Sequence, residues 1–501
     1  MIVVPSDQAE IPTGDRDLTV EPAAYRAAVA RLDALIDLSG PPDQSLPAIW
    51  GRAAAKLDRA RAFLAHLGNP QDRFPIVHVT GTSGKGSTCV AIARVLSRAG
   101  YRTGLATSPY LQVATEKLQI DGRLIGAQAF ADLVDRVLDA AGTWQRRAGL
   151  ERPLSYGEIW VALMALWFAE RQVDIAVIEV GAGGRFDVTN LVQPVVAVVT
   201  SVGLDHTATL GPTIERIAWH KAGIFKAGAP AVTAVTDPVA FGVLAAEATA
   251  LGIDLTRIDP TKAVVVHESG PDGTGWSLRD RAADGDAPVF HSRVAGRHHA
   301  INGAVAVTAL DVLRGLGYRI TDRDLVDGLA EARLPGRGER MPNADPVVLI
   351  DAAHNPDKVR AFVASLRGVL PGSILKPPVL LTGAVVGKDL ATMMASLAPV
   401  VSAVVTTSVE ITGKAPIDAA SLAKVVAETG FAGPVLACAD VDAALDIAIR
   451  WAAARGTAVV ATGSLYLAGA VRGRWYPADE IVRQQTPWPE QGPSSGDSVV
   501  S

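Results

Sequence analysis

Cysteine is scarce in this chain, which has only Cys89 and Cys438 among its 501 residues. Two thiols so far apart in the sequence argue against a disulfide framework and against a metal cage built from thiolates. A chain with so few thiols is suited to a reducing compartment. We therefore expect a cytoplasmic protein.

Long apolar runs without charge are also missing, although the mean hydropathy is +0.24, so we expect no membrane span. The first residues are acidic where a signal peptide needs basic ones, and we expect no such peptide. Lys and Arg number 47 against 52 Asp and Glu, a net charge of −5, and no basic stripe is evident. Nucleic acids and anionic membranes are therefore not the expected partners.

The apolar fraction of 49% is enough for more than one hydrophobic core in a chain of this length. Residues 1–22 and 484–501 are rich in polar residues, Pro, Ser and Gly, and we expect a flexible extension and a flexible tail there. Between them we expect a larger domain over 23–336 and a smaller one over 337–483. We expect the protein to be a monomer.

Short β-branched runs alternate with longer amphipathic stretches, a pattern typical of βαβ units and a mostly parallel sheet. Residues Ala263–Arg293 break it with shorter strand-like pieces, and Leu334–Gly338 breaks it again as an expected hinge. The alternation then resumes from Val347. The predicted fold class is α/β, with an N-terminal P-loop-type domain and a smaller C-terminal Rossmann-like domain.

A glycine-rich loop separates the predicted strand Ile76–Thr80 from an amphipathic helix. Its residues are Gly81, Thr82, Ser83, Gly84, Lys85, Gly86 and Ser87. Backbone N–H groups in such a loop can surround an anion, and Lys85 adds a positive charge for terminal phosphates. The alternative is a plain turn with an exposed lysine. Gly86 stands where the usual P-loop has a magnesium-binding hydroxyl, so metal ligands must come from elsewhere, Ser87 being one candidate.

The loop sequence T-G-T-S-G-K-G-S resembles the folylpolyglutamate synthase branch of the Mur ligase superfamily. Further segments resemble that family in order and spacing: Thr107–Leu111, Thr115–Leu118, Glu179–Asn190, Gly203–His206, Lys221–Ile224, Gly296–His298 with Asn302, Pro335–Arg337 and Asp351–Pro356. Two positions differ from the family pattern. Tyr110 replaces a usual His, and His220 replaces a usual Glu.

The resemblance implies an ATP-dependent ligase that joins L-glutamate to dihydropteroate and to reduced folates through an acyl phosphate. It also implies Mg²⁺, with two ions expected, held by Ser108, Glu179 and His206. Glu179 ends an apolar strand and His206 follows another, so both should face the crevice at the carboxyl ends of a parallel sheet. The alternatives are a surface carboxylate and a hydrogen-bonded structural histidine.

Lys85, His206 and Lys221 are the catalytic candidates, because family members carry at the last position a lysine carbamylated into a metal-binding carboxylate. A helix-surface lysine is the alternative for Lys221. The resemblance assigns Asn302, Arg337, Asp351 and His354 to the nucleotide. For Asp351 the alternative is a helix N-cap, and for Arg337 a solvated surface charge.

Two other functions compete with this one. A Mur-type peptidoglycan ligase has the same chemistry, but commonly carries a UDP-sugar domain before the loop. Here the loop starts at Gly81, which leaves too little chain for that domain. The second competitor is a P-loop regulator or ATPase that makes no amide, which ATP turnover dependent on both glutamate and a pteroate would exclude.

Overall fold

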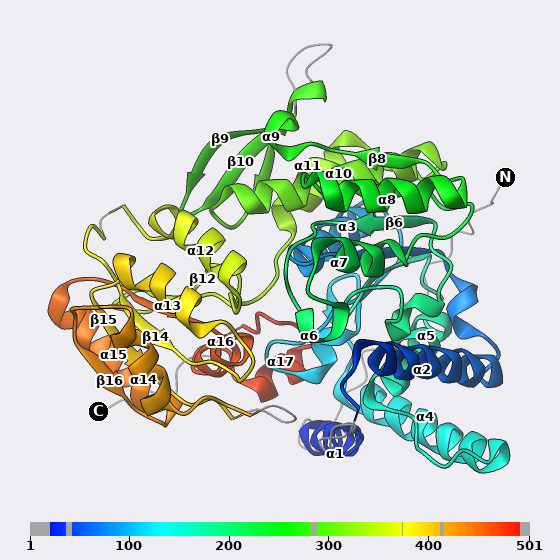
Figure 1. Ribbon diagram of the computed structural model, residues 1–501, viewed down its shortest axis with the longest axis horizontal. Helices are drawn as coiled ribbons and strands as arrows, with labels where there is room; N and C mark the ends of the chain where they lie inside the picture. The colour runs from blue at the N-terminus through cyan, green and yellow to red at the C-terminus, as the bar shows by residue number, and fades with distance from the viewer. Residues whose placement is uncertain (1–20, 37–42, 282–287, 373, 411–414, 491–501) are drawn as a thin grey trace, which may run out of the picture.

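The computed structural model describes residues 21–36, 43–281, 288–372, 374–410 and 415–490. Figure 1 shows two α/β bodies side by side, the first built from the blue to green part of the chain and the second mainly from the yellow to orange part, while the red helix α17 (Ala478–Gln484) packs on the first body. Each is organised around its own sheet. The predicted fold class is confirmed.

The larger sheet has eight strands in the order β4-β3-β2-β5-β1-β6-β7-β8. In that order they are Arg123–Leu124, Gln119–Ile120, Thr103–Ala106, Ile175–Glu179, Ile76–Thr80, Val196–Val199, Ala231–Thr233 and Leu255–Arg257. The strands from β2 to β8 pair in parallel, while β3 and β4 add an antiparallel edge. The parallel register places the carboxyl ends of β1, β5 and β6 beside one another.

Successive side chains of the central strands point to opposite faces of this sheet, and apolar residues on both faces form a hydrophobic core on each side. Val77 and Val177 pack in a cluster with α3 (Lys85–Arg98), α10 (Arg297–Gly315) and α11 (Asp322–Glu331). Ile76 and Ile178 point to the other face. That face is covered by α1 (Glu21–Asp33), α2 (Leu46–His66), α4 (Ala127–Ala148), α5 (Tyr156–Glu170), α7 (Ile214–Ala222) and α8 (Pro238–Leu251). The described part of the chain contains no helix long and apolar enough to cross a bilayer.

The strand-rich segment predicted over residues 263–293 is a three-stranded antiparallel sheet of β9 (Val264–Gly270), β10 (Gly273–Leu278) and β11 (Phe290–Ser292), preceded by α9 (Pro260–Ala263). Trp276 of β10 is fully buried against α10. A Cβ at Gly303 would lie 2.4 Å from its ring, so glycine at this position permits the close packing of helix on sheet.

The second sheet has six strands in the order β12-β13-β17-β14-β15-β16. In that order they are Glu339–Arg340, Val348–Ile350, Val459–Thr462, Val379–Thr382, Ala403–Thr406 and Val435–Ala437. One face is covered by α12 (Pro356–Val369), α13 (Leu390–Leu397) and α14 (Ala419–Glu428), the other by α15 (Val441–Arg455) and α16 (Leu465–Arg472). Short 3-10 turns occur at Pro70–Arg73, Ala114–Lys117, Val188–Leu191, Arg279–Arg281 and Ala398–Val400.

Arg472, at the end of α16, is fully buried and joins the two bodies. Its guanidinium donates to both Glu339 carboxylate oxygens at 3.0 Å and to Gln112 Oε1 at 2.6 Å. Gln112 belongs to the segment that follows Ser108, and Glu339 follows the predicted hinge. Charged, hydrogen-bonded contacts of this kind fix the orientation of the segments that they join.

The expected terminal extensions lie largely outside the described residues. α1 begins at Glu21, and residues 1–20 and 491–501 are not described. The first residues of the expected flexible tail are packed instead: after α17 (Ala478–Gln484), Pro487 O accepts from Arg472 and Trp488 Nε1 donates to Glu339. Polar composition misled here because the Pro487 carbonyl and the Trp488 indole anchor that stretch to distant residues.

Candidate functional site

The glycine-rich loop is held in place from the side by the end of β6. Thr82 N donates to Ser201 O at 3.0 Å, and Ser83 N donates to Ser201 Oγ at 2.9 Å. Thr200 Oγ1 donates in turn to Ser83 O at 2.6 Å. These bonds fix the loop backbone before any ligand arrives. Binding is favoured because the loop then loses less conformational entropy when the ligand binds.

Two glycines of the loop are required by close contacts. Gly84 has φ +85°, a region that L side chains avoid, and a Cβ there would lie 2.2 Å from Asn302 Oδ1. A Cβ at Gly81 would lie 1.8 Å from Thr200 Oγ1. Lys85 opens α3, and its Nζ donates to Gly81 O at 3.1 Å. The loop therefore presents a helix N-terminus and an ammonium to one space.

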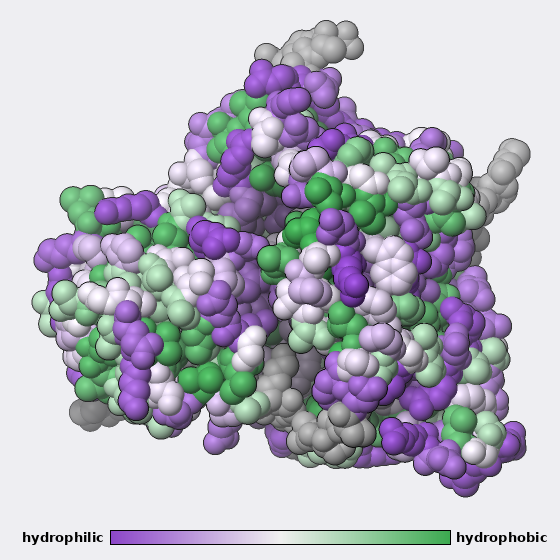
Figure 2. Space-filling model, in the orientation of Figure 1, coloured by the Kyte–Doolittle hydropathy of each residue, from purple (hydrophilic) through white to green (hydrophobic). Residues whose placement is uncertain are grey.

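That space is a cleft of about 440 Å³ between the two bodies, visible as a recess in the space-filling view of Figure 2. It is lined by every residue that the sequence marked as a site candidate: Gly81, Thr82, Ser83, Gly84, Lys85, Gly86, Ser87, Ser108, Glu179, His206, Lys221, Asn302, Arg337, Asp351 and His354. The first eleven come from the N-terminal body and Asn302 from α10. Arg337, Asp351 and His354 come from the hinge and the second body. Their individual roles stay predictions.

Glu179, the last residue of β5, is only 9% exposed, which excludes the surface alternative. Its Oε2 accepts from Ser108 N at 3.0 Å. Burial raises the pKa of this carboxyl, and Lys85 opposes the rise. A Cβ at Gly86 would already be 3.4 Å from Oε2, so the glycine brings the loop close to the carboxylate.

Glu179 fits a magnesium ion, because it is a buried carboxylate with no salt bridge to another described residue. No three His, Cys, Asp or Glu side chains among the described residues lie close enough to hold a metal. Magnesium keeps phosphate and water ligands and needs few from protein. An oxygen donor such as Glu179 with the Ser108 hydroxyl therefore suits it, whereas His206 would be an uncommon nitrogen ligand.

His206 stands directly before α6 (Thr207–Leu210) with φ +52°. The adjoining Asp205 reaches the second body, since Asn355 Nδ2 donates to Asp205 Oδ2 at 3.1 Å and Lys388 Nζ lies 3.9 Å from Oδ1. Loop 203–206 therefore connects both sides of the cleft.

Lys221, in the last turn of α7, is 2% exposed, so it is not a helix-surface lysine. Burial lowers the pKa of its amine well below the usual range, and Lys85 lowers it further. The neighbouring His220 points elsewhere, with its ring 5.1 Å from the Trp50 and Trp219 rings and 5.6 Å from Phe186. The departure from the family's Glu therefore places an aromatic contact beside Lys221 in place of a carboxylate.

Asp351 accepts from Gly338 N and Ala353 N, both at 2.8 Å. It is not a helix cap, because Asn355 caps α12 through Lys358 N. Burial raises the pKa of Asp351, and Arg337 beside it opposes the rise. A buried carboxylate and a guanidinium thus face the cleft together.

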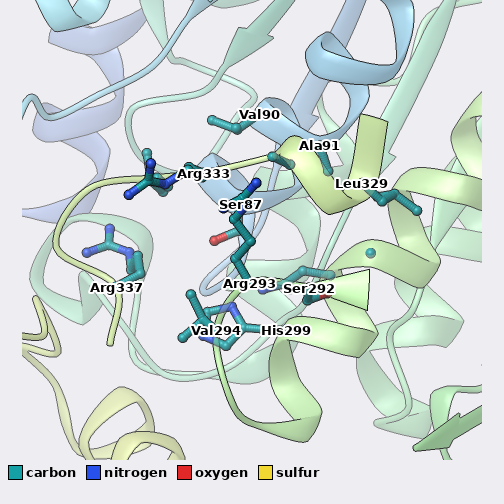
Figure 3. A pocket seen from close by; sticks show the side chains of 14 residues that line it. Ser87, Val90, Ala91, Ser292, Arg293, Val294, His299, Leu329, Arg333 and Arg337 are labelled. Carbon is teal, nitrogen blue, oxygen red and sulfur yellow. The ribbon is translucent and has the colours of Figure 1, made fainter. Parts of the chain in front are cut away.

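A small pocket of about 50 Å³ adjoins the cleft at Ser87, Asn302 and Arg337. Figure 3 shows Ser87 and Val90 of α3 on one side of the pocket, His299 on another and Arg337 on a third. The pocket continues the cleft past the first turn of α3. If phosphates bind at the glycine-rich loop, the rest of the ligand that carries them would extend in this direction.

A second cavity, of about 230 Å³, shares Ser108, Glu179 and Gly181 with the cleft. Its other walls are mainly apolar and aromatic: Ala106, Leu118, Tyr156, Trp160, Val161, Met164, Ile178 and Val188. Lys117 Nζ lies 3.8 Å from the Trp160 ring centre, and burial lowers the pKa of this amine to about 7. A flat, apolar ligand with one polar edge suits such a cavity.

Sequence reasoning missed three functional features. The first is Thr200 and Ser201, which hold the loop. They directly follow a predicted strand, and this position could have marked them as site residues. Asp205 joins the bodies, which only tertiary structure reveals. Lys358 lines the cleft from the first turn of α12. A basic residue is unfavourable at this end of a helix because it opposes the helix dipole. The sequence therefore already indicated that Lys358 is unusual.

The chain matches two protein families, the Mur ligase middle domain over residues 79–310 and the Mur ligase glutamate ligase domain over residues 336–465. It is 34% identical to folylpolyglutamate synthase of Lacticaseibacillus casei, over 83% of this chain and 93% of that one. It is 32% identical to the dihydrofolate synthase/folylpolyglutamate synthase of Mycobacterium tuberculosis, over 84% of this chain and 90% of that one. The solved M. tuberculosis folylpolyglutamate synthase complexed with ADP superposes with a TM-score of 0.78 at 29% identity, over 91% of this chain and 99% of that one.

Proposed function

This chain belongs to the folylpolyglutamate synthase family of ATP-dependent Mur ligases, and from that premise we propose that it joins L-glutamate to dihydropteroate and to reduced folates. The product in each case is an amide. The observation that carries the proposal is the shared wall of Ser108, Glu179 and Gly181 between the cleft and the second cavity. One side suits phosphates and the other a flat aromatic ring, so a ring bound in the cavity can extend its carboxylate toward the phosphate loop.

The chemistry follows from this arrangement. A carboxylate oxygen of the substrate attacks the γ-phosphorus of ATP, the bond from phosphorus to the bridging oxygen of ADP breaks, and an acyl phosphate forms. Lys85 and the loop N–H groups stabilise the charge that spreads over the transferring phosphoryl group. The amine of glutamate then attacks the acyl carbon, and phosphate leaves.

The metal and the modified lysine belong to the proposal. Bound magnesium supplies charge neutralisation at the phosphates, and Glu179, Ser108 and His206 would hold the ions, two of them as expected from the resemblance. Burial lowers the pKa of the Lys221 amine, which favours the neutral form that is nucleophilic toward CO₂ and so supports a carbamate. Lys85, Lys221 and His206 remain the catalytic candidates.

Asn302, Arg337, Asp351 and His354 would bind the nucleotide beyond its phosphates. The small pocket beside Ser87 and Asn302 is the proposed place for the base, since it lies on the continuation of the cleft past α3. The hinge residue Arg337 lines both spaces. We also propose a cytoplasmic monomer, and the two free thiols Cys89 and Cys438 support a reducing compartment.

The test is mass spectrometry of the products after incubation with ATP, Mg²⁺, glutamate and either dihydropteroate or a reduced folate. The proposal expects each acceptor to gain glutamyl units. Glutamyl addition to the reduced folate alone would leave a folylpolyglutamate synthase without the first activity. ATP hydrolysis without an amide product would favour the ATPase alternative, and ligation to a UDP-muramyl acceptor would favour the peptidoglycan ligase.

A further inference from the structure

The cleft between the two bodies holds a group of basic side chains that the assignments above do not fully use. Lys85 and Lys221 face it from the N-terminal body, Arg337 from the hinge, and Lys358 from the second body. Lys358 forms no salt bridge with any described carboxylate, although Asp351 and Asp205 line the same cleft. Both carboxylates are already engaged, Asp351 by backbone N–H groups and Asp205 by Asn355.

The position of Lys358 is unfavourable without an anion. It stands in the first turn of α12, where its backbone N–H is capped by Asn355 Oδ1 at 2.9 Å. An ammonium near a helix N-terminus is repelled by the positive end of the helix dipole. The same helix end attracts anions, so the ammonium and the helix end would stabilise one bound anion together.

His354 fixes the direction of the Lys358 side chain. His354 Nδ1 lies 2.9 Å from Ala352 O, which can only accept, so Nδ1 carries the proton. His354 Nε2 therefore presents a lone pair, and Lys358 Nζ donates to it at 3.0 Å. Burial lowers the pKa of His354 well below its ordinary value, so the ring stays neutral and serves as an acceptor that aims the ammonium.

The charged surroundings of Lys358 point toward the phosphate loop. Burial, then Lys85, then Arg337 lower the pKa of its amine to about 7, and Asp205 opposes them while Lys388 adds to them. Lys221 and Glu179 across the cleft, and Asp351 and His354 on the same body, are the remaining titratable groups whose pKa Lys358 itself influences. Among these groups the strongest charge interaction is with Lys85, the residue assigned to the terminal phosphates.

We propose that Lys358 is a catalytic cation that the C-terminal domain places on the γ-phosphoryl group of ATP, opposite Lys85. This inference rests on the proposed function. In the transfer step the substrate oxygen forms its bond to the γ-phosphorus as the bond to ADP breaks, and Lys358 keeps its protons throughout. It stabilises the negative charge on the equatorial oxygens in that transition state, and afterwards on the acyl phosphate. Phosphoryl transfer thereby requires both bodies.

The first experiment compares Lys358→Gln and Lys358→Arg with the wild type. Glutamine retains an N–H donor for His354 Nε2 but removes the charge, and arginine retains the charge. We expect Lys358→Gln to lower kcat on the order of hundredfold or more, Lys358→Arg to retain activity within about tenfold of the wild type, and KM for glutamate to stay unchanged in both. Lys424→Met, on the exposed surface of α14, is the matched control for losing one charge from the same body.

The second experiment measures proton uptake when Mg²⁺ and the non-hydrolysable analogue AMPPCP bind, by calorimetry in buffers of different ionisation enthalpy. An amine with a pKa of about 7 is largely neutral at pH 7.5, and a polyanion beside it restores its proton. We expect the wild type to take up as much as about 0.75 proton more per site than Lys358→Gln at pH 7.5. Lys424→Met should behave as the wild type does.

Two results would overturn the inference. Near-normal kcat with unchanged proton uptake in Lys358→Gln would remove Lys358 from the phosphate site. A raised KM for glutamate, with kcat and proton uptake unchanged, would assign it to a glutamate carboxylate instead. The proposed function and this inference can fail separately. If the wild type forms no glutamyl product, the proposed function fails, but proton uptake on AMPPCP binding can still be compared between the wild type and Lys358→Gln. That comparison shows whether Lys358 contacts the nucleotide.

Discussion

The two walls of the cleft are built in different ways. The N-terminal wall is built around the phosphate loop, whose backbone Thr200 and Ser201 fix before any ligand binds. The C-terminal wall presents side chains such as Asp351 and His354 from a separate sheet, and in the cleft it contacts the first wall through the hydrogen bond from Asn355 to Asp205. The first wall is suited to binding phosphate, and the second to completing the site once the bodies are aligned.

The N-terminal wall should be the most sensitive to substitution. Lys85→Ala and Glu179→Ala remove a charge on the transferring phosphoryl group and a metal ligand, so each should lower kcat on the order of hundredfold or more. Melting temperatures should stay close to the wild type. Steady-state assay of both glutamate additions checks this, and near-normal turnover in either variant would exclude that residue from the mechanism.

Lys221→Ala should inactivate the enzyme to a similar degree, with partial recovery when short carboxylates are added. The reason is that a small anion can occupy the place of a carbamate, whereas the guanidinium of Lys221→Arg fills that place and should block recovery. Intact-protein mass spectrometry without acid, which would strip a carbamate, checks the modification. An unmodified lysine mass in active protein would contradict this prediction.

Sequence reasoning predicted the cleft well because its residues follow strand ends. Parallel strands place their carboxyl ends along one edge, so Glu179 and the phosphate loop were expected to meet there. Asp351 and His354 follow β13 in the same way. The periodicity of the strands and the order of the motifs were therefore enough to predict many of the residues that line the cleft.

Contacts between distant segments could not be predicted in this way. The Arg472 to Glu339 pair joins residues 133 positions apart, and no local pattern encodes such a pairing. The anchored stretch after Gln484 was misjudged for the same reason, since the Trp488 indole is held by the distant Glu339 as well as its backbone N–H by Thr486. The second cavity likewise combines α5 with four separate segments, at residues 106–108, 117–118, 178–181 and 187–189.

Lys117→Met tests the cavity that adjoins the N-terminal wall. Lys117 is the half-buried lysine of this cavity, so its loss should raise KM for dihydropteroate about tenfold, the effect of losing one charged hydrogen bond, while KM for ATP stays unchanged. In the wild type, KM for dihydropteroate should rise as pH increases through about 7, because Lys117 loses its proton there. A flat pH profile of KM would argue against a contact between Lys117 and the substrate.

The smallest effect is expected at the contact between the walls. Asn355→Ser retains an oxygen that caps α12 but removes the amide N–H that reaches Asp205, and it should lower kcat/KM by about three- to tenfold. Asn355→Ala should lose the cap as well, and about 1 kcal/mol of stability with it. Thermal denaturation separates the two effects. Equal melting temperatures in both variants would show that the cap contributes little.

Transfer of the γ-phosphoryl group to the substrate carboxylate is the central step of the proposed reaction. Dihydropteroate labelled with ¹⁸O in its carboxylate tests this when the phosphate released during ligation is analysed by mass spectrometry. The acyl-phosphate route leaves one carboxylate oxygen on each phosphate, so we predict one ¹⁸O in the phosphate for every amide formed. Phosphate without ¹⁸O, released in step with the amide, would contradict the account.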